Sequence, residues 1–414
     1  MSQFNLTKEQ KVLLNLISLN VNGNANELVL SDQEIDGVNW EEVAKESIVQ
    51  SVPLCALDSC AVYKKFIPEN IFAKWSAYSM RVMQSNMKVI NSQQELINIL
   101  GEKHPYLILK GTSVCSYYNK PILRALGDVD FLIEPKQQSE IEKLLIDNGY
   151  TLSGGDHPNH VVFKKPGAHL EMHFEVAGVP YGKIGELVKE FLKDAVYAPV
   201  KKSYESCEFN APTDLNHALI LLLHMQHHML GEGFGLRHLS DWTVFVNKTH
   251  NEAFWQEKLL PFLKKIGLYN YAKIMTKVGA VYLNSILPVW AKDADDDVCA
   301  QIINDILTGG NFGRKDENRS SSGMLISEHG KGGTKHGAVY NLAHGLHKAV
   351  LRKKAVKKCI LLYPFVYVYK AIRFVFLSII GKRPSIVKML PEAEKRKVIY
   401  DKLAIFETDL QEKQ

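Results

Sequence analysis

The sequence predicts an α+β protein, in which a small mixed sheet forms a core that helical regions flank on its N-terminal and C-terminal sides. Three observations lead to this fold class. Apolar residues recur at helical spacing up to residue 100, short apolar runs bounded by Gly and Pro fill residues 105–176, and helical spacing returns from Thr213 onward. Strands and helices that alternate over so short a stretch indicate a small mixed sheet with helices on one side.

The N-terminal helical region is expected over residues 1–100. Thr7 and Gln10 have the spacing of a capping box ahead of an apolar run, which predicts the start of a helix. Residues 73–100 contain few helix breakers and predict a long helix that ends this region.

The sheet core is expected over residues 101–205. Its short apolar runs are typical of buried strands. Gly149 is expected to end the helix over residues 137–148. The expected elements are strands at 106–109, 129–133, 161–163 and 170–176, with helices at 112–118 and 137–148.

A helical domain is expected over residues 206–307, beginning at a helix that Thr213 caps. Residues 308–337 contain eight Gly and little apolar periodicity, which predicts a long loop. A basic helical segment is expected over residues 338–414.

Composition excludes several classes of protein. The 414 residues are 46% hydrophobic and 23% charged, which is ordinary for a globular protein of two or three domains and excludes a disordered chain or a collagen. Six scattered cysteines without a CxxC pair indicate reduced thiols. The first ten residues lack the basic flank and apolar run of a secretory signal, so we expect a cytoplasmic protein.

Acidic side chains gather in the core. Asp128 and Asp130 alternate along one expected strand, and Glu171 and His173 alternate along another, so each pair shares a face of its strand. Carboxylates that converge on one face repel one another unless a cation lies between them, and their oxygens suit Mg²⁺ or Mn²⁺.

Gly111 follows a strand and opens a helix, an arrangement that lets a phosphate approach backbone N–H groups. Taken alone, the two spaced aspartates and the glycine are common patterns that chance and solvated strand edges also produce. The ordered combination within about seventy residues is more specific than any single part of it.

The combination resembles the bacterial uncharacterised nucleotidyltransferase family, within the DNA polymerase β-like nucleotidyltransferase superfamily. The resemblance covers roughly residues 75–380 and extends to two helical motifs, at 222–228 and 236–241. Its most specific motifs are Leu109-Lys110-Gly111, Tyr118-Asn119-Lys120-Pro121, Arg124, Gly127-Asp128-Val129-Asp130-Phe131-Leu132 and Glu171-Met172-His173.

The resemblance implies a catalytic, metal-binding triplet of Asp128, Asp130 and Glu171 that holds two Mg²⁺ or Mn²⁺ ions. It also implies that Gly111 and Thr112 contact the triphosphate of a nucleoside triphosphate, although Thr112 replaces the more usual Ser or Gly of the family. For two cations the role stays open: Lys110 either neutralises pyrophosphate or is a solvated charge, and Arg124 either orients the triphosphate or anchors Asp130.

The expected function is therefore a metal-dependent transfer of a nucleoside monophosphate from a nucleoside triphosphate to a hydroxyl or phosphate acceptor, with release of pyrophosphate. Phosphoryl transfer on the same scaffold is an alternative, because the residues do not distinguish attack at the α phosphorus from attack at the γ phosphorus. A non-catalytic protein that binds a nucleotide or a partner is another. The acceptor and the preferred base stay open.

Histidines and a charged pair form a second candidate group, expected to bind substrate. His224 and His228 share a helix face at a spacing that can bind zinc, but Met225 stands where HExxH has its glutamate and the sequence indicates no third ligand. A polar cleft wall with Arg237 and Asp241, or a buried hydrogen-bonded cluster, is the alternative. His173 is expected to position Glu171.

Residues 329–391 carry 13 Lys or Arg and no Asp or Glu. They include an apolar stretch, 359–381, but Lys370 and Arg373 lie near its middle, where each would cost about 2.5–3.5 kcal/mol in a bilayer, so a transmembrane helix is rejected. Two interpretations stay open: a helix that packs on the body of the protein, or an interfacial helix through which residues 348–388 meet an anionic membrane surface at the inner face. Nucleic acid is a third anionic partner, for which the sequence shows no recognisable module.

Overall fold

The computed structural model describes residues 5–23, 29–153, 159–316, 318–327, 337–351, 363–380 and 386–408. Its centre is a five-stranded sheet with the strand order β1-β2-β5-β4-β3. The strands are β1 (Tyr106–Ile108), β2 (Val129–Ile133), β3 (Thr151–Leu152), β4 (His160–Lys165) and β5 (Ala168–His173). The mixed α/β architecture with a small mixed sheet is confirmed.

The sheet is mixed because one of its four strand pairs is parallel. Strands β2 and β5 run parallel, whereas β1–β2, β4–β5 and β3–β4 are antiparallel. The parallel register places Asp130 beside Glu171 and Leu132 beside His173. Chain segments about forty residues apart in sequence therefore become immediate neighbours at the centre of the sheet.

The two faces of the sheet have different environments. Val129, Phe131 and Ile133 of β2 pack with Leu170 and Met172 of β5 in a core that also holds side chains of the long helix α5 (Glu69–Leu100) and of α7 (Gln138–Asp147). The alternate positions, which include Asp130 and Glu171, face the other side. Because side chains alternate along the strands, one face of the sheet is buried and apolar and the other carries the charged residues.

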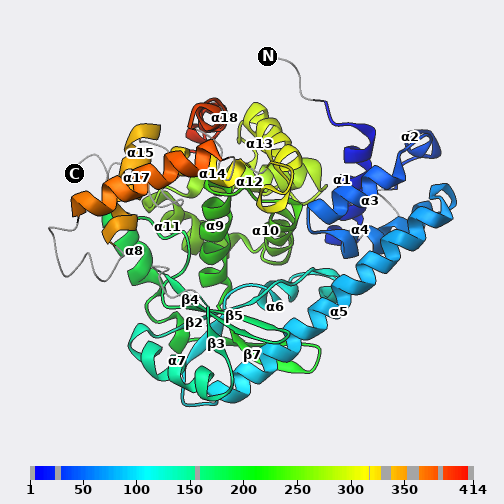
Figure 1. Cartoon of the computed structure of the whole chain (residues 1–414). Coiled ribbons are helices and arrows are strands. Elements are labelled where there is room, and N and C mark those ends of the chain that lie inside the picture. The colour runs from blue at the N-terminus through cyan, green and yellow to red at the C-terminus, as the bar shows by residue number, and fades with distance from the viewer. Residues whose placement is uncertain are drawn as a thin grey trace.

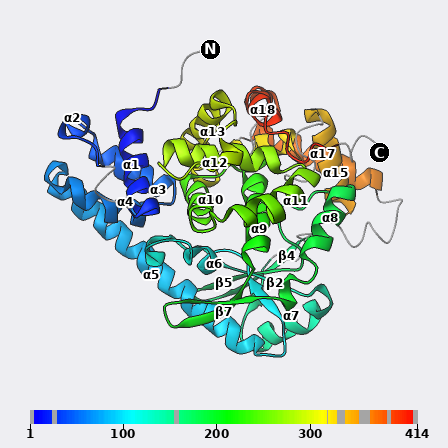
Figure 2. The ribbon, with the colours of Figure 1, turned by 180° about the vertical axis from the view of Figure 1, so that it is seen from behind.

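Helices before the sheet form one end of the molecule (Figure 1). Thr7 caps α1 in the predicted capping box, which the structure confirms. Helix α5 runs from this group to the sheet and ends under it, as both views show (Figures 1 and 2). The group contains α1 (Lys8–Asn22), α2 (Asp32–Ile35), α3 (Trp40–Val49), α4 (Pro53–Ser59) and the 3₁₀ helix η1 (Cys60–Phe66).

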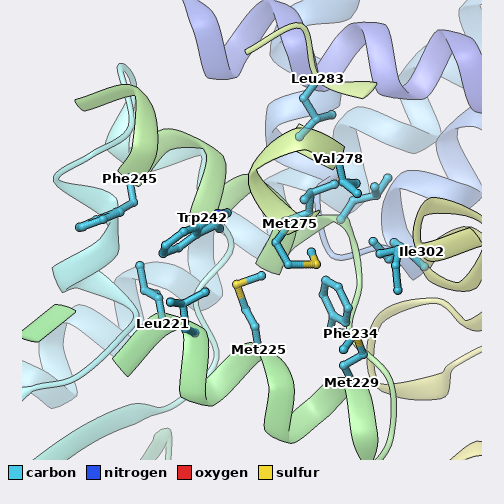
Figure 3. Packing of buried hydrophobic residues seen from close by; sticks show 14 of the residues in the cluster. Leu221, Met225, Met229, Phe234, Trp242, Phe245, Met275, Val278, Leu283 and Ile302 are labelled. Carbon is cyan, nitrogen blue, oxygen red and sulfur yellow. The ribbon is translucent and has the colours of Figure 1, made fainter. Parts of the chain in front are cut away.

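Helices after the sheet form a second body above its charged face. Figure 3 shows its core, in which Met225 of α9 lies near Trp242 of α10 and Met275 of α12, and Met229 lies near Phe234. The elements are α9 (Asp214–Leu230), α10 (Leu236–Lys248), the π-helix η5 (Phe254–Leu259), α11 (Leu260–Lys265), α12 (Tyr269–Tyr282), the 3₁₀ helix η6 (Val289–Ala291) and α13 (Asp296–Gly309).

Several elements differ from the sequence prediction. The helix expected at 112–118 is the short α6 (Thr112–Cys115). Three further elements were not predicted: strand β3, helix α8 (Gly182–Leu192) and a hairpin of β6 (Val200–Tyr204) and β7 (Cys207–Ala211). The remaining short 3₁₀ helices of the core are η2 (Pro121–Leu123), η3 (Pro135–Gln137) and η4 (Ala195–Tyr197).

The expected loop at 308–337 is wrong in part. It contains the 3₁₀ helix η7 (Asn311–Gly313) and helix α14 (Arg319–Ile326), while residues 328–336 lie outside the described residues. Glycine misled the prediction, because Gly309 and Gly313 pack tightly against Arg319: a Cβ on Gly309 would lie 2.3 Å from its guanidinium. These glycines allow close packing and do not mark a flexible linker.

The C-terminal segment contributes α15 (Ala338–Leu351), α17 (Tyr363–Ile379) and α18 (Ile386–Asp401). Arg396 of α18 is buried and donates to the backbone oxygens of Met229 and Gly231 at the end of α9, which anchors α18 to the body. Helix α17 contacts α15, and another of its faces is exposed, with Phe365 73% exposed and Ile379 78%. No described helix combines the length and apolar character that crossing a membrane requires.

Candidate functional site

A cleft of about 790 Å³ lies between the charged face of the sheet and the helical body. Strands β2, β4 and β5 line one side, while α9, α10 and η7 line the other. The predicted site residues that line it are Lys110, Gly111, Arg124, Asp128, Asp130, Glu171, His173, His224, His228 and Arg237. Thr112 and Asp241 are not among its lining residues.

The carboxylates lie in a dense network of charges. Lys110 Nζ is 2.9 Å from Asp130 Oδ1, and His173 Nε2 is 3.0 Å from the same oxygen. His173 Nε2 is also 3.6 Å from Glu171 Oε2. His173 therefore connects the two carboxylates that the strand register places side by side, which extends the positioning role expected for it.

Proton affinities in the network differ from residue to residue. Burial opposes the charge of Asp130, but Lys110 and His173 outweigh that penalty and hold its pKa well below the usual range. Repulsion from Asp130, together with burial, raises the pKa of Asp128 to about 7. Burial opposes the charge on Lys110 and His173, yet the surrounding carboxylates raise the pKa of both. Of the three carboxylates, Asp128 is thus the one whose negative charge is least balanced by neighbouring positive groups.

The donor set fits a hard divalent cation. One ligand atom each from Asp128, His169 and Glu171 lie within 4.8 Å of one another, and an ion between the carboxylates would relieve the repulsion that raises the pKa of Asp128. His169 was missed by the sequence analysis. Its signal was present, because His169, Glu171 and His173 alternate along β5 and must share one face.

Gly111 and Thr112 differ in how far they match their predicted roles. Gly111 lies at the start of α6 with φ of +64°, which favours glycine, and it lines the cleft. Thr112 is 2% exposed and its hydroxyl donates to Gln93 Oε1 at 2.6 Å. The expected contact of the Thr112 hydroxyl with a triphosphate is therefore not supported, because that hydroxyl is used inside the core.

Arg124 does not pair with Asp130, which was one of the two roles that the sequence left open for it. Its Nε and Nη2 each donate to Asp241 across 2.7 Å, in a buried bidentate pair. Tyr118 donates to the same carboxylate at 2.8 Å. The pair joins the segment before β2 to helix α10. Arg124 therefore does not anchor Asp130. The carboxylate oxygens of Asp241 accept from Arg124 and do not line the cleft.

His224, His228 and His238 bring three imidazoles together from α9 and α10. Their rings lie between 4.3 and 5.5 Å apart, centroid to centroid, and Phe312 of η7 packs 4.8 Å from His228. Burial holds the pKa of all three well below the usual value, so all three are neutral. The sequence analysis did not anticipate His238, because it lies on a different helix from the other two.

Arg237 and His160 complete the cleft wall. The guanidinium of Arg237 lies 5.6 Å from the ring of Phe312, and its Nε has no hydrogen-bond partner within the described ranges. His160 on β4 lines the cleft, with its ring 5.0 Å from that of His173. Arg237 thus keeps donor capacity for an anionic ligand, in line with its predicted role.

The fold and the cleft together define an α+β protein with a clustered carboxylate site on its sheet. The chain belongs to the uncharacterised nucleotidyltransferase family, whose model matches residues 36–283. The match contains every site residue that the sequence predicted. No curated protein sequence matches the chain.

Removing the carboxylate of Asp128 should stabilise the metal-free protein above neutral pH. A folded pKa of about 7, above the usual value of 3.8, means that the wild type loses stability as the pH rises between these two values and no more above 7. Between pH 5 and pH 8, Asp128→Asn should gain about 2 kcal/mol in unfolding free energy relative to wild type. Urea denaturation with a chelator present measures this.

Asp147→Asn, at an exposed carboxylate of α7, is the matched control and should show no such trend. An Asp128→Asn variant that is less stable than wild type at pH 8 would show that Asp128 is a structural group.

Breaking the buried pair should destabilise the fold. Arg124→Met leaves Asp241 buried without its partner, which costs about 3–5 kcal/mol of unfolding free energy. The double variant Arg124→Met/Asp241→Leu should recover most of this loss, and Arg81→Met, the same change at an exposed site, should have little effect. If Arg124→Met has normal stability but binds nucleotide more weakly, Arg124 contacts phosphate and is not a structural residue.

Proposed function

We propose that the chain is a metal-dependent nucleotidyltransferase with a polymerase β-like core. It transfers a nucleoside monophosphate from a nucleoside triphosphate to a hydroxyl or phosphate acceptor and releases pyrophosphate. The observation that carries the proposal is the gathering of Asp128, Asp130 and Glu171 on one wall of a single cleft, with Asp130 and Glu171 in register on adjacent strands. Family membership supports the general class of reaction.

Charge is the first support for metal dependence. The three carboxylates lie close enough for Asp130 to raise the pKa of Asp128, and a triphosphate that entered the cleft would add further negative charge. Bound Mg²⁺ or Mn²⁺ would supply the charge neutralisation that an in-line displacement at phosphorus requires. Asp128, Asp130 and Glu171 are the residues that would hold it.

The protein's own groups would position the reactants. Lys110 lies in the cleft beside Asp130 and carries a positive charge toward the phosphate end of the donor. The cleft volume of about 790 Å³ is in the range of small-ligand sites. As the acceptor oxygen bonds to the α phosphorus, the bond to the pyrophosphate oxygen breaks, and the acceptor proton leaves to a base.

The rival functions make different use of the same residues. A kinase-like reaction would direct the acceptor at the γ phosphorus and release a nucleoside diphosphate. A non-catalytic nucleotide-binding protein would need no cluster of carboxylates at the phosphates, because such a cluster repels phosphate unless a metal ion is present. That cost favours catalysis over binding alone.

The assay that tests the proposal offers each nucleoside triphosphate, labelled at the α or the γ phosphorus, with Mg²⁺ or Mn²⁺. Release of pyrophosphate, or transfer of the α label, is expected from the wild type. Asp128→Asn/Asp130→Asn should reduce it by at least roughly a hundredfold. Asp147→Asn is the control for a carboxylate outside the cleft.

Each other outcome changes the assignment. Transfer of the γ label would indicate a phosphoryltransferase. No turnover, but a melting temperature that nucleotide and metal raise together, would favour the binding protein. Because Asp130→Asn leaves Lys110 without its ion pair, circular dichroism must show that the variant is folded, and Glu171→Gln serves as an independent second variant.

A further inference from the structure

The three imidazoles on the helical side of the cleft satisfy the geometric conditions for a metal site. One nitrogen each from His224, His228 and His238 lies within 4.8 Å of the other two. His224 and His228 are one turn apart on α9, and His238 projects from the start of α10. The third ligand that the sequence lacked is thus supplied by a neighbouring helix.

Their polar atoms are left without partners in a buried place. Neither ring nitrogen of His238, which is 3% exposed, has a hydrogen-bond partner among the described residues, nor does Nδ1 of His224, which is 9% exposed. A buried polar group without a partner costs about 1–3 kcal/mol. An ion that binds one nitrogen of each ring would give such buried atoms a partner.

We propose that His224, His228 and His238 bind a divalent transition-metal ion of the zinc class, with an open coordination position toward the cleft. Three neutral imidazoles are ligands that zinc prefers, and three protein ligands leave the fourth position free. A Zn–N bond of about 2.0–2.1 Å requires nitrogens roughly 3.4 Å apart, so nitrogens that lie within 4.8 Å of one another need to close by about 1.4 Å at most.

A neighbouring side chain supports the arrangement. Asn311 of η7 lies beside His238 without reaching hydrogen-bond geometry, and its Oδ1 has no partner within the described part of the chain. Its amide nitrogen is fixed by Ser51 Oγ at 2.9 Å. An amide oxygen held in this way is the kind of acceptor that orients a metal-binding histidine through its second ring nitrogen.

The site is chemically distinct from the carboxylate site in the same cleft. Carboxylate oxygens favour Mg²⁺ or Mn²⁺, whereas imidazole nitrogens favour Zn²⁺, Cu²⁺ or Ni²⁺. Resting on the proposed function, the open position together with Arg237 would receive an anionic group of the acceptor. Binding of the ion itself does not depend on that function.

The test titrates chelator-treated full-length protein with Co²⁺ and records the visible d–d bands that report four-coordinate cobalt. One equivalent should bind, and Zn²⁺ should displace it. His224→Gln and His228→Gln should each weaken binding at least tenfold, and Asn311→Ala by roughly tenfold. His227→Gln, next to His228 on α9, is the matched control and should keep the signal, as should Asp128→Asn.

Two results would overturn the proposal. One is the absence of four-coordinate cobalt in the wild type. The other is a signal that survives His224→Gln and disappears in Asp128→Asn or Glu171→Gln, which would place the ion at the carboxylates and His169. His228 is only partly buried, so its variant remains informative if His224→Gln fails to fold. Because cobalt absorbance needs no turnover, failure here leaves the nucleotidyltransferase assay unaffected, and the reverse also holds.

A second, independent feature is an apolar stripe on α17. Phe365, Val368, Ile372, Phe376 and Ile379 recur at helical spacing and are each more than half exposed. Within the described residues, α17 has contacts with α15 on another face. An exposed apolar stripe of this kind is typical of an interaction surface.

We infer that α17 docks on an anionic membrane surface. Residues 329–391 carry 13 Lys or Arg and no acidic residue, and Arg373 is exposed on α17 itself. This charge complements anionic lipid headgroups and would repel a second copy of the same segment. Apolar residues beside cations are the pattern of a helix that lies in the membrane interface.

Flotation with vesicles tests this inference. The protein should float with vesicles that contain phosphatidylglycerol but not with pure phosphatidylcholine, and salt should weaken the binding. Phe365→Ser/Ile372→Ser/Phe376→Ser should reduce binding at least roughly tenfold, because each lost apolar group removes burial in the interface. Met80→Ser/Ile146→Ser/Val281→Ser, at exposed apolar positions elsewhere, is the matched control.

Equal binding by both triple variants, or no binding by the wild type, would overturn the inference. Self-association that depends on the α17 stripe, without vesicle binding, would assign the stripe to a second copy of the chain.

Discussion

The largely buried negative charge at the centre of the sheet is the constraint on which the rest of the structure depends. The parallel register of β2 and β5 places Asp130 beside Glu171. Asp128, directly before β2, adds a third carboxylate close to them. Lys110 and His173 compensate Asp130 from two sides. Lys110 and His173 do not balance the negative charge of the cluster fully, since repulsion and burial raise the pKa of Asp128 to about 7. The site is therefore built with a deficit of positive charge that a ligand can fill.

The rest of the fold keeps this cluster rigid and accessible. One face of the sheet is sealed by a core that includes Phe131 and Met172, so the carboxylates can only face the cleft. The opposite wall belongs to the helical body, and the buried Arg124–Asp241 pair ties that body to the chain immediately before Asp128. A buried pair is a poor source of stability compared with apolar packing. Its bidentate geometry holds the segment before β2 against helix α10.

The sequence allowed the fold class, most helices and the two faces of the central strands to be predicted, because these follow from periodicity within one element. The alternation of Asp128 with Asp130 and of Glu171 with His173 is of this kind. The failures at Thr112 and Arg124 depend on tertiary neighbours. The hydroxyl of Thr112 is taken by Gln93, a residue of α5, and Arg124 pairs with Asp241 more than a hundred positions away. Neither choice leaves a signal in the local pattern, and the same is true of His238.

The cleft holds two groups of potential metal ligands of different chemistry, carboxylates on the sheet side and imidazoles on the helical side. Asp128 and Glu171 present hard oxygens, but His169 lies within reach of both, so an excess of a zinc-class ion could also bind there. A purely imidazole site elsewhere in the cleft would compete for that ion, because His224, His228 and His238 offer three neutral nitrogens and no charge repulsion. The imidazole cluster would thereby leave the carboxylates to the harder and more abundant Mg²⁺. Separation of the two ions then follows from donor chemistry alone and needs no difference in cavity size.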